Sequence, residues 1–161
     1  MRNNKGFSLV ELIIVIAIMA ILVGVMAPQL IKYIEKTNVS SDTQLCDTVK
    51  SAVTTAVMDP SVLNDTNSKS RLAQTGTWVA VSGLTSTTAE FDKAIQETLG
   101  MDATSIANID QKIKSAHGTS AAIQYNIMGS NSVHVRIPYT DVNGKKSTGE
   151  GSDATKIIYV D

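Results

Sequence analysis

The sequence predicts an α+β fold in which a long N-terminal spine helix packs on a small antiparallel sheet. Three observations lead to this prediction. Residues 12–31 form an uncharged apolar run of 20 residues. A helical pattern of apolar residues follows this run, and the C-terminal third changes to the two-residue alternation that is typical of half-buried strands. The 161 residues suffice for about one domain and an appendage.

The apolar run is long enough to cross a bilayer core as a helix. Arg2 and Lys5 precede it, and basic residues on this side favour an N-terminus that stays in the cytoplasm. Lys32 and Lys36 follow it, so the charge asymmetry is weak. The first half of the spine helix is therefore predicted to span a membrane.

Three interpretations of this segment compete. A secretory signal peptide could be cut after Ala27, but Pro28 would then follow the cut directly and the apolar run is long for such a peptide. A plain membrane anchor would need no processing. The third interpretation is a precursor with a short basic leader that ends at Gly6.

The string Lys5-Gly6-Phe7-Ser8-Leu9-Val10-Glu11 resembles the prepilin peptidase motif of type IV pilins and pseudopilins. The resemblance covers roughly residues 1–55 and implies cleavage after Gly6, followed by methylation of the new N-terminal amine of Phe7. It also implies that Glu11 pairs with the Phe7 amine of a neighbouring subunit. The expected organisation is a leader at 1–6, a transmembrane and assembly helix at 7–34, and a pilin-like head at 35–161.

Physical chemistry supports these residue roles. A carboxylate near an apolar span is costly unless it has a partner, and Glu11 is the only charged residue between Lys5 and Lys32. Gly6 gives a peptidase an accessible backbone without bulk before the cut. Gly24 and Pro28 weaken the helix, and Pro28 removes a backbone donor, so a kink or local opening is predicted there.

The spine helix is predicted to continue into the head. Leu45, Val49, Val53 and Val57 recur every four residues, which indicates an amphipathic helix whose apolar stripe faces a core. Asp42, Asp47 and Lys50 are expected off that stripe, and Asp59-Pro60 is expected to end the helix. Residues 61–75 are polar and aperiodic, which predicts a surface loop.

Short elements are predicted to connect the helix to the sheet. Residues 78–81 are a strand candidate, and residues 87–90 fit a capping box before a helix that ends at Gly100. Ile106, Ile109 and Ile113 suggest another helix, ending near 117–118.

The C-terminal third supplies the expected antiparallel strands. Apolar residues alternate over 123–127 and 133–137, with a turn at 129–132 between them. Asn143-Gly144 indicates a tight turn, and 156–160 forms the last predicted strand.

The charge and the cysteine content limit which partners and which disulfides are expected. Fourteen basic and 15 acidic residues give a net charge of −1 without a long basic run, so nucleic acid is not an expected partner, although a local patch in an assembly could still bind it. The lone Cys46 allows no disulfide within the chain and is expected to be a buried apolar residue.

No cofactor motif, metal spacing or catalytic constellation is recognisable, so enzymatic activity is not expected. Asp141, Glu150 and Asp153 could offer oxygens to calcium, but a polar hairpin loop is the favoured interpretation of that region.

The resulting hypothesis is a structural subunit of an extracellular type IV pilus. It implies a homo-oligomeric helical filament, a prepilin peptidase and methyltransferase, and membrane assembly machinery as partners. The subunit would lie in the cytoplasmic membrane before assembly and in a cell-surface filament afterwards. A pseudopilin of type II secretion or competence is the related alternative, and a membrane-anchored extracellular binding module is the alternative from another class.

Overall fold

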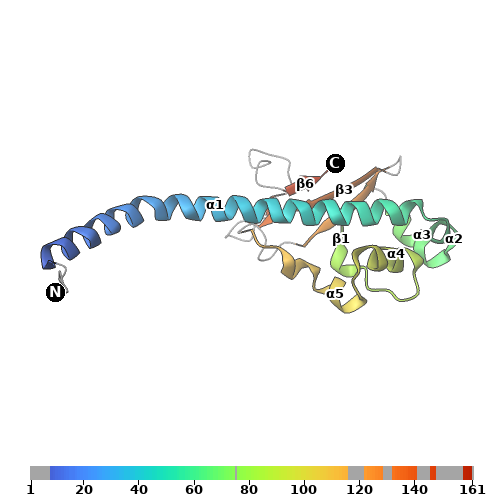
Figure 1. The fold of residues 1–161 in the computed structure, drawn as a ribbon. Coiled ribbons are helices and arrows are strands. Elements are labelled where there is room, and N and C mark those ends of the chain that lie inside the picture. The colour runs from blue at the N-terminus through green and yellow to red at the C-terminus, as the bar shows by residue number, and fades with distance from the viewer. Residues whose placement is uncertain are drawn as a thin grey trace, which may run out of the picture. The chain divides into compact units, whose positions relative to one another are not determined.

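The structure is a computed structural model, and it describes residues 8–74, 76–115, 122–128, 132–140, 146–147 and 158–160. The chain divides into two compact units, Met1–Thr37 and Asn38–Asp161. The described part of the first unit is helical apart from Ser8. The second unit holds the remaining helices and the sheets (Figure 1).

Helix α1 runs from Leu9 to Met58 as one 50-residue helix. It has no buried residue before Asp42, and from there one face is buried. The apolar stripe predicted from Leu45 to Val57 is confirmed: Val49 and Val53 are fully buried, and Leu45 packs against the core from its edge. The predicted end of the helix is also confirmed, because Asp59 leaves the helical conformation.

The prediction of a surface loop over residues 61–75 is wrong. Two short helices occupy most of it, α2 (Pro60–Asn64) and α3 (Thr66–Leu72). An aspartate caps each of them: Asp59 accepts a hydrogen bond from the Ser61 amide, and Asp65 accepts from the amides of Asn67 and Ser68. Both helices are too short to show a hydrophobic period, but their N-caps and Pro60 are recognisable helix-start signals.

Helix α4 (Glu90–Leu99) confirms the helix predicted before Gly100. Gly100 ends it in the left-handed conformation, with φ of 63°, and glycine adopts this conformation without steric cost. Phe91 and Ile95, four residues apart, are fully buried and form its inner face.

The predicted capping box of α4 at residues 87–90 is wrong. The N-cap is Ala89, which makes no side-chain cap hydrogen bond. Instead, α3 caps α4: Asp65 Oδ2 accepts from the Glu90 amide at 3.1 Å, and Ser68 Oγ accepts from the Phe91 amide at 2.8 Å. The pKa of Asp65 is lowered to about 2, mainly by the hydrogen bond from the Ser68 hydroxyl and secondly by the one from the Glu90 amide.

The helix predicted around Ile106–Ile113 is interrupted. The structure has α5 (Ala103–Ala107) and a 3₁₀ helix, η2 (Ile109–Lys112), with Asn108 between them at φ −105° and ψ 13°. Ile106 and Ile109 are buried as expected. The 3₁₀ helix η2 ends at Lys112, and the end expected near 117–118 lies outside the described residues.

The main sheet has the strand order β1-β2-β3-β6, and every pairing in it is antiparallel. The strands are β1 (Val79–Ala80), β2 (Gln124–Met128), β3 (Ser132–Ile137) and β6 (Ile158–Val160). A short 3₁₀ helix, η1 (Val81–Gly83), follows β1, so the first predicted strand is shorter than expected. Residues 139–140 (β4) and 146–147 (β5) form a separate two-stranded sheet. Of the turn expected at 129–132, residues 129–131 lie outside the described residues and Ser132 begins β3, and the turn expected at 143–144 also lies outside them.

The core lies between the buried face of α1, the sheet and the short helices. In β2 and β3, Tyr125 pairs with Val135 in register, and both side chains are buried. The Tyr125 ring also lies against Phe91 of α4, with 6.0 Å between ring centroids. The predicted fold class is confirmed, with a long N-terminal helix packed on a small antiparallel sheet. The fully buried core includes Cys46, Val49, Ala52, Val53, Ala56, Val62, Val81, Leu84, Phe91, Ile95, Ile106, Ile109, Ile123, Val135 and Ile137.

Cys46 is fully buried, as predicted, and burial raises the pKa of its thiol to about 12, with Asp42 and Asp47 adding to the effect. The reactive thiolate is therefore scarce at pH 8. We expect iodoacetamide to leave the folded chain unmodified over minutes at this pH and to alkylate it fully once it is denatured. Intact-mass measurement would check this, and rapid labelling of the folded chain would contradict the burial of Cys46.

Candidate functional site

The sequence places its candidate site at the start of α1. Gly6 and Phe7 lie outside the described residues, so cleavage and methylation there stay predictions. Glu11, Gly24 and Pro28 all lie within α1, in the first compact unit.

Glu11 closes the first turn of α1. Its Oε2 accepts a hydrogen bond from the Ser8 amide at 2.9 Å, and Ser8 Oγ accepts one from the Val10 amide at 3.3 Å. These bonds satisfy backbone donors that a helix start otherwise leaves unpaired, and a carboxylate in the first turn is also favoured by the helix dipole. This capping role was not predicted, although Ser8 and Glu11 have the three-residue spacing of a capping box.

The cap leaves room for a second role of the same carboxylate. An ionised carboxyl group has two oxygens and about four acceptor positions, and the Ser8 amide occupies one of them. A cationic donor from another molecule can therefore bind Glu11 while the cap is intact. The hydrogen bond to the backbone also orients the carboxylate, since it ties the side chain to the helix start.

The surface of α1 beyond Glu11 is apolar. Every large apolar side chain from Leu9 to Ile34 is exposed, by between 45% for Val15 and 73% for Leu9. An apolar surface of this extent needs lipid or other apolar helices to cover it. By length and composition, the helix can cross a membrane.

Gly24 and Pro28 lie inside this apolar segment, and α1 continues through both. Pro28 removes one backbone donor from the helix. No heavy atom lies within 4 Å of the position that a Cβ on Gly24 would occupy, so steric crowding in this chain does not require a glycine there. The kink or local opening at these residues stays a prediction.

Comparison with known proteins identifies the segment. Residues 1–27 match the family model described as the prokaryotic N-terminal methylation motif. The chain carries a prepilin-like signal. This confirms the resemblance to the signal of type IV pilins and pseudopilins. In general, such a signal implies processing by prepilin peptidase, a membrane-anchored stage and later assembly into a filament.

The match covers the N-terminal motif and not the head. No curated protein and no solved structure matches the chain. The pilin-like arrangement of the head therefore rests on the helix and sheet described above.

The calcium-binding oxygens considered at Asp141, Glu150 and Asp153 lie outside the described residues. Within the ranges that the structure describes, no three His, Cys, Asp or Glu side chains are grouped as metal ligands.

Proposed function

We propose that this protein is a structural, non-enzymatic subunit of an extracellular type IV pilus. One observation carries the proposal: the methylation motif over residues 1–27 leads directly into a helix whose large apolar side chains are exposed as far as Ile34. A filament core of packed helices would cover that surface after assembly, as lipid would before it. Residues 1–6 would be the leader, 7–34 the assembly helix and 35–161 the head.

Cleavage between Gly6 and Phe7 would create a free α-amine at the start of the assembly helix. Methylation would keep the positive charge of that amine. In the filament, the Phe7 amine of one subunit would bind Glu11 of the next, on an acceptor position that the Ser8 amide leaves open. Because unpaired charges are costly in apolar surroundings, this pairing would set the axial position of each subunit.

The subunit would first lie in the cytoplasmic membrane with its N-terminus inside. Prepilin peptidase would process it there, and the assembly machinery would move it into a surface filament with other copies. The same signal also occurs in pseudopilins, so a subunit of a type II secretion or competence pseudopilus is the second candidate.

Processing provides the direct test. We expect subunits from sheared surface material to begin at Phe7 and to carry a methyl group on its amine, as measured by intact mass and N-terminal sequencing. Replacing Gly6 by Leu should leave the full-length precursor in the membrane fraction, because bulk before the cut obstructs the peptidase. Gly24→Leu is the matched control and should be processed normally, since its Cβ position is open. Subunits that begin at Met1 or Pro28 would rule out the proposed function.

A further inference from the structure

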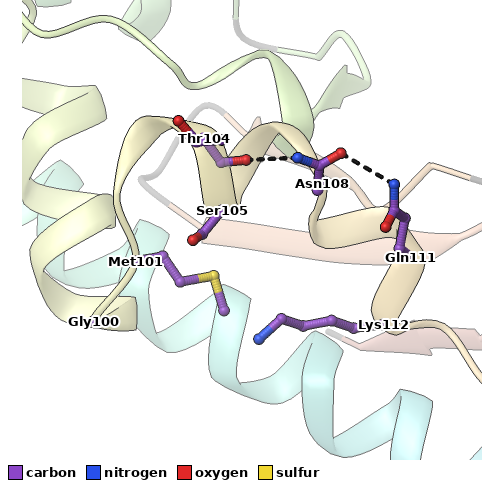
Figure 2. Close-up of a pocket in the computed structure, with 7 residues that line it drawn as sticks. All are labelled: Gly100, Met101, Thr104, Ser105, Asn108, Gln111 and Lys112. Atoms are coloured by element: carbon purple, nitrogen blue, oxygen red, sulfur yellow. Dashed lines mark hydrogen bonds between the residues drawn. The ribbon is translucent and has the colours of Figure 1, made fainter.

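A polar pocket lies on the head, between the end of α4 and η2. It is lined by Gly100 and Met101 after α4, Thr104 and Ser105 of α5, Asn108, and Gln111 and Lys112 of η2. It is a wide, open hollow of about 650 Å³, so a ligand would lie across it and stay partly exposed. In Figure 2, the Lys112 and Met101 side chains point toward one another across the hollow.

Hydrogen bonds hold the amide groups of this pocket in place. Asn108 donates its Nδ2 to the Thr104 carbonyl at 2.9 Å, and its Oδ1 accepts from Gln111 Nε2 at 3.1 Å (Figure 2). The Gln111 carbonyl oxygen is therefore oriented by the chain Thr104–Asn108–Gln111. Ordered amides of this kind can exchange hydrogen bonds with a ligand at little entropic cost.

A second hollow of about 440 Å³ adjoins the first and shares Gln111 and Lys112 with it. Its remaining lining residues are Ser41, Gln44, Leu45 and Thr48 of α1 and Lys114. The residues that line the two hollows include two lysines and no carboxylate. Among the described residues, neither Lys112 nor Lys114 forms an ion pair.

The segment that carries the two lysines is fixed to α1. Asp42 is fully buried, and its two carboxylate oxygens accept hydrogen bonds from the amides of Lys114 and Ser115, each at 2.9 Å. Ile113, between the lysines, packs against the core. Both lysines are exposed, so their ammonium groups are available on a rigid backbone.

We propose that these two hollows form a binding site for an acidic oligosaccharide. The hydroxyl and amide side chains match sugar hydroxyls, which both donate and accept hydrogen bonds. Met101 and Leu45 offer apolar contacts for the faces of sugar rings. Lys112 and Lys114 pair with sugar carboxylates, and the two adjoining hollows hold consecutive sugar units.

The lining favours a saccharide over an acidic peptide. Neutral hydrogen-bonding side chains outnumber the charged ones in both hollows, which suits a ligand with many hydroxyl groups, whereas an acidic peptide offers mainly carboxylates and backbone amides. The proposal concerns the head alone and does not depend on filament assembly.

The test uses the full chain in detergent micelles and a defined probe, the trimer of α-1,4-linked galacturonic acid. Its fully methyl-esterified form, which has the same rings without charge, is the ligand control. Binding is measured by calorimetry at low and at physiological salt. We expect the acid to bind, the ester to bind more weakly, and the affinity for the acid to fall as salt rises.

Two protein variants locate the site. Lys112→Gln and Lys114→Gln should each weaken binding of the acid roughly two- to fivefold, as expected for exposed ion pairs. Neither should change the melting temperature, because both side chains are exposed. Lys69→Gln removes an exposed lysine on α3 and is the matched control, which should bind as the unmodified chain does.

Absence of binding by the acid would overturn the proposal. Equal binding of the acid and the ester would overturn the role of the lysines, and equal weakening by Lys69→Gln would show nonspecific attraction in place of a site. Processing at Gly6 could still occur in each of these cases, so failure here is distinguishable from failure of the proposed pilus function.

Discussion

Glu11→Ala is expected to give processed, membrane-held subunits that form few or no filaments. The span becomes more apolar, so membrane insertion should not suffer. In the proposed pairing, the Phe7 amine of the adjoining subunit would lose its acceptor, and a buried charge left without its partner costs about 3–5 kcal/mol. Because the cost recurs at every subunit, growth should stop. Electron microscopy of sheared surface fractions, from cells in which the variant is the sole copy, measures the result.

Two further variants separate this pairing from the capping role of Glu11. Glu11→Gln keeps an oxygen for the Ser8 amide but lacks the charge, so it should also abolish filaments. Ser8→Ala removes the Oγ that accepts from the Val10 amide and keeps the charge. That change weakens the helix start by about 1 kcal/mol and should leave filaments present. Normal filament numbers with Glu11→Gln would refute the pairing mechanism.

Asp42→Ala is expected to lower the free energy of unfolding of the head by about 2–5 kcal/mol. The substitution leaves the amides of Lys114 and Ser115 without their acceptor. A buried donor without a partner costs about 1–3 kcal/mol, and the part-buried Lys114 amide costs less than the buried Ser115 amide. Trp78 is the only tryptophan of the chain and lies in the head. Its fluorescence during thermal unfolding of the detergent-solubilised chain can therefore follow the head alone.

Asp47→Ala is the matched control for Asp42. Asp47 lies on the same helix but is exposed, and its removal should change stability by less than about 0.5 kcal/mol. Similar losses from both variants would show that the charge of α1, and not the hydrogen bonds of Asp42, stabilises the head.

Asp42 also shows where sequence reasoning failed. The apolar stripe of α1 predicted its buried face correctly from Leu45 to Val57, because periodicity reports the average direction of a helix face. The same reasoning placed Asp42 off the stripe, whereas it is fully buried. Its partners are backbone amides 72 and 73 residues further along the chain. The helical period itself places Asp42 on the buried face, four residues before Cys46 and seven before Val49. The identity of its distant amide partners is what no local pattern contains.

The N-terminal motif was recognisable from the sequence alone, while the roles of its residues stay predictions. Gly6, Phe7 and Glu11 have fixed offsets at the head of an apolar run, and the match to the methylation motif confirms the resemblance. The short helices α2 and α3 were missed because five and seven residues are too few for a helical period to emerge. The strands β2 and β3 were predictable because each alternates over five or six residues.

The dependence of α4 on α3 has a consequence for the order of folding. The first two amides of α4 donate to Asp65 and Ser68, which lie 25 and 23 residues earlier. Arg71 of α3 also binds Asp92 of α4 at 3.1 Å. Until α3 lies beside it, the first two amides of α4 have only water as an acceptor, so packing of the two helices stabilises the start of α4. Loops of this length close rapidly and at modest entropic cost compared with the more distant pairing of α1 with segment 114–115. This pair of helices can therefore assemble early and present the buried side of α4 to β2 before the sheet is complete.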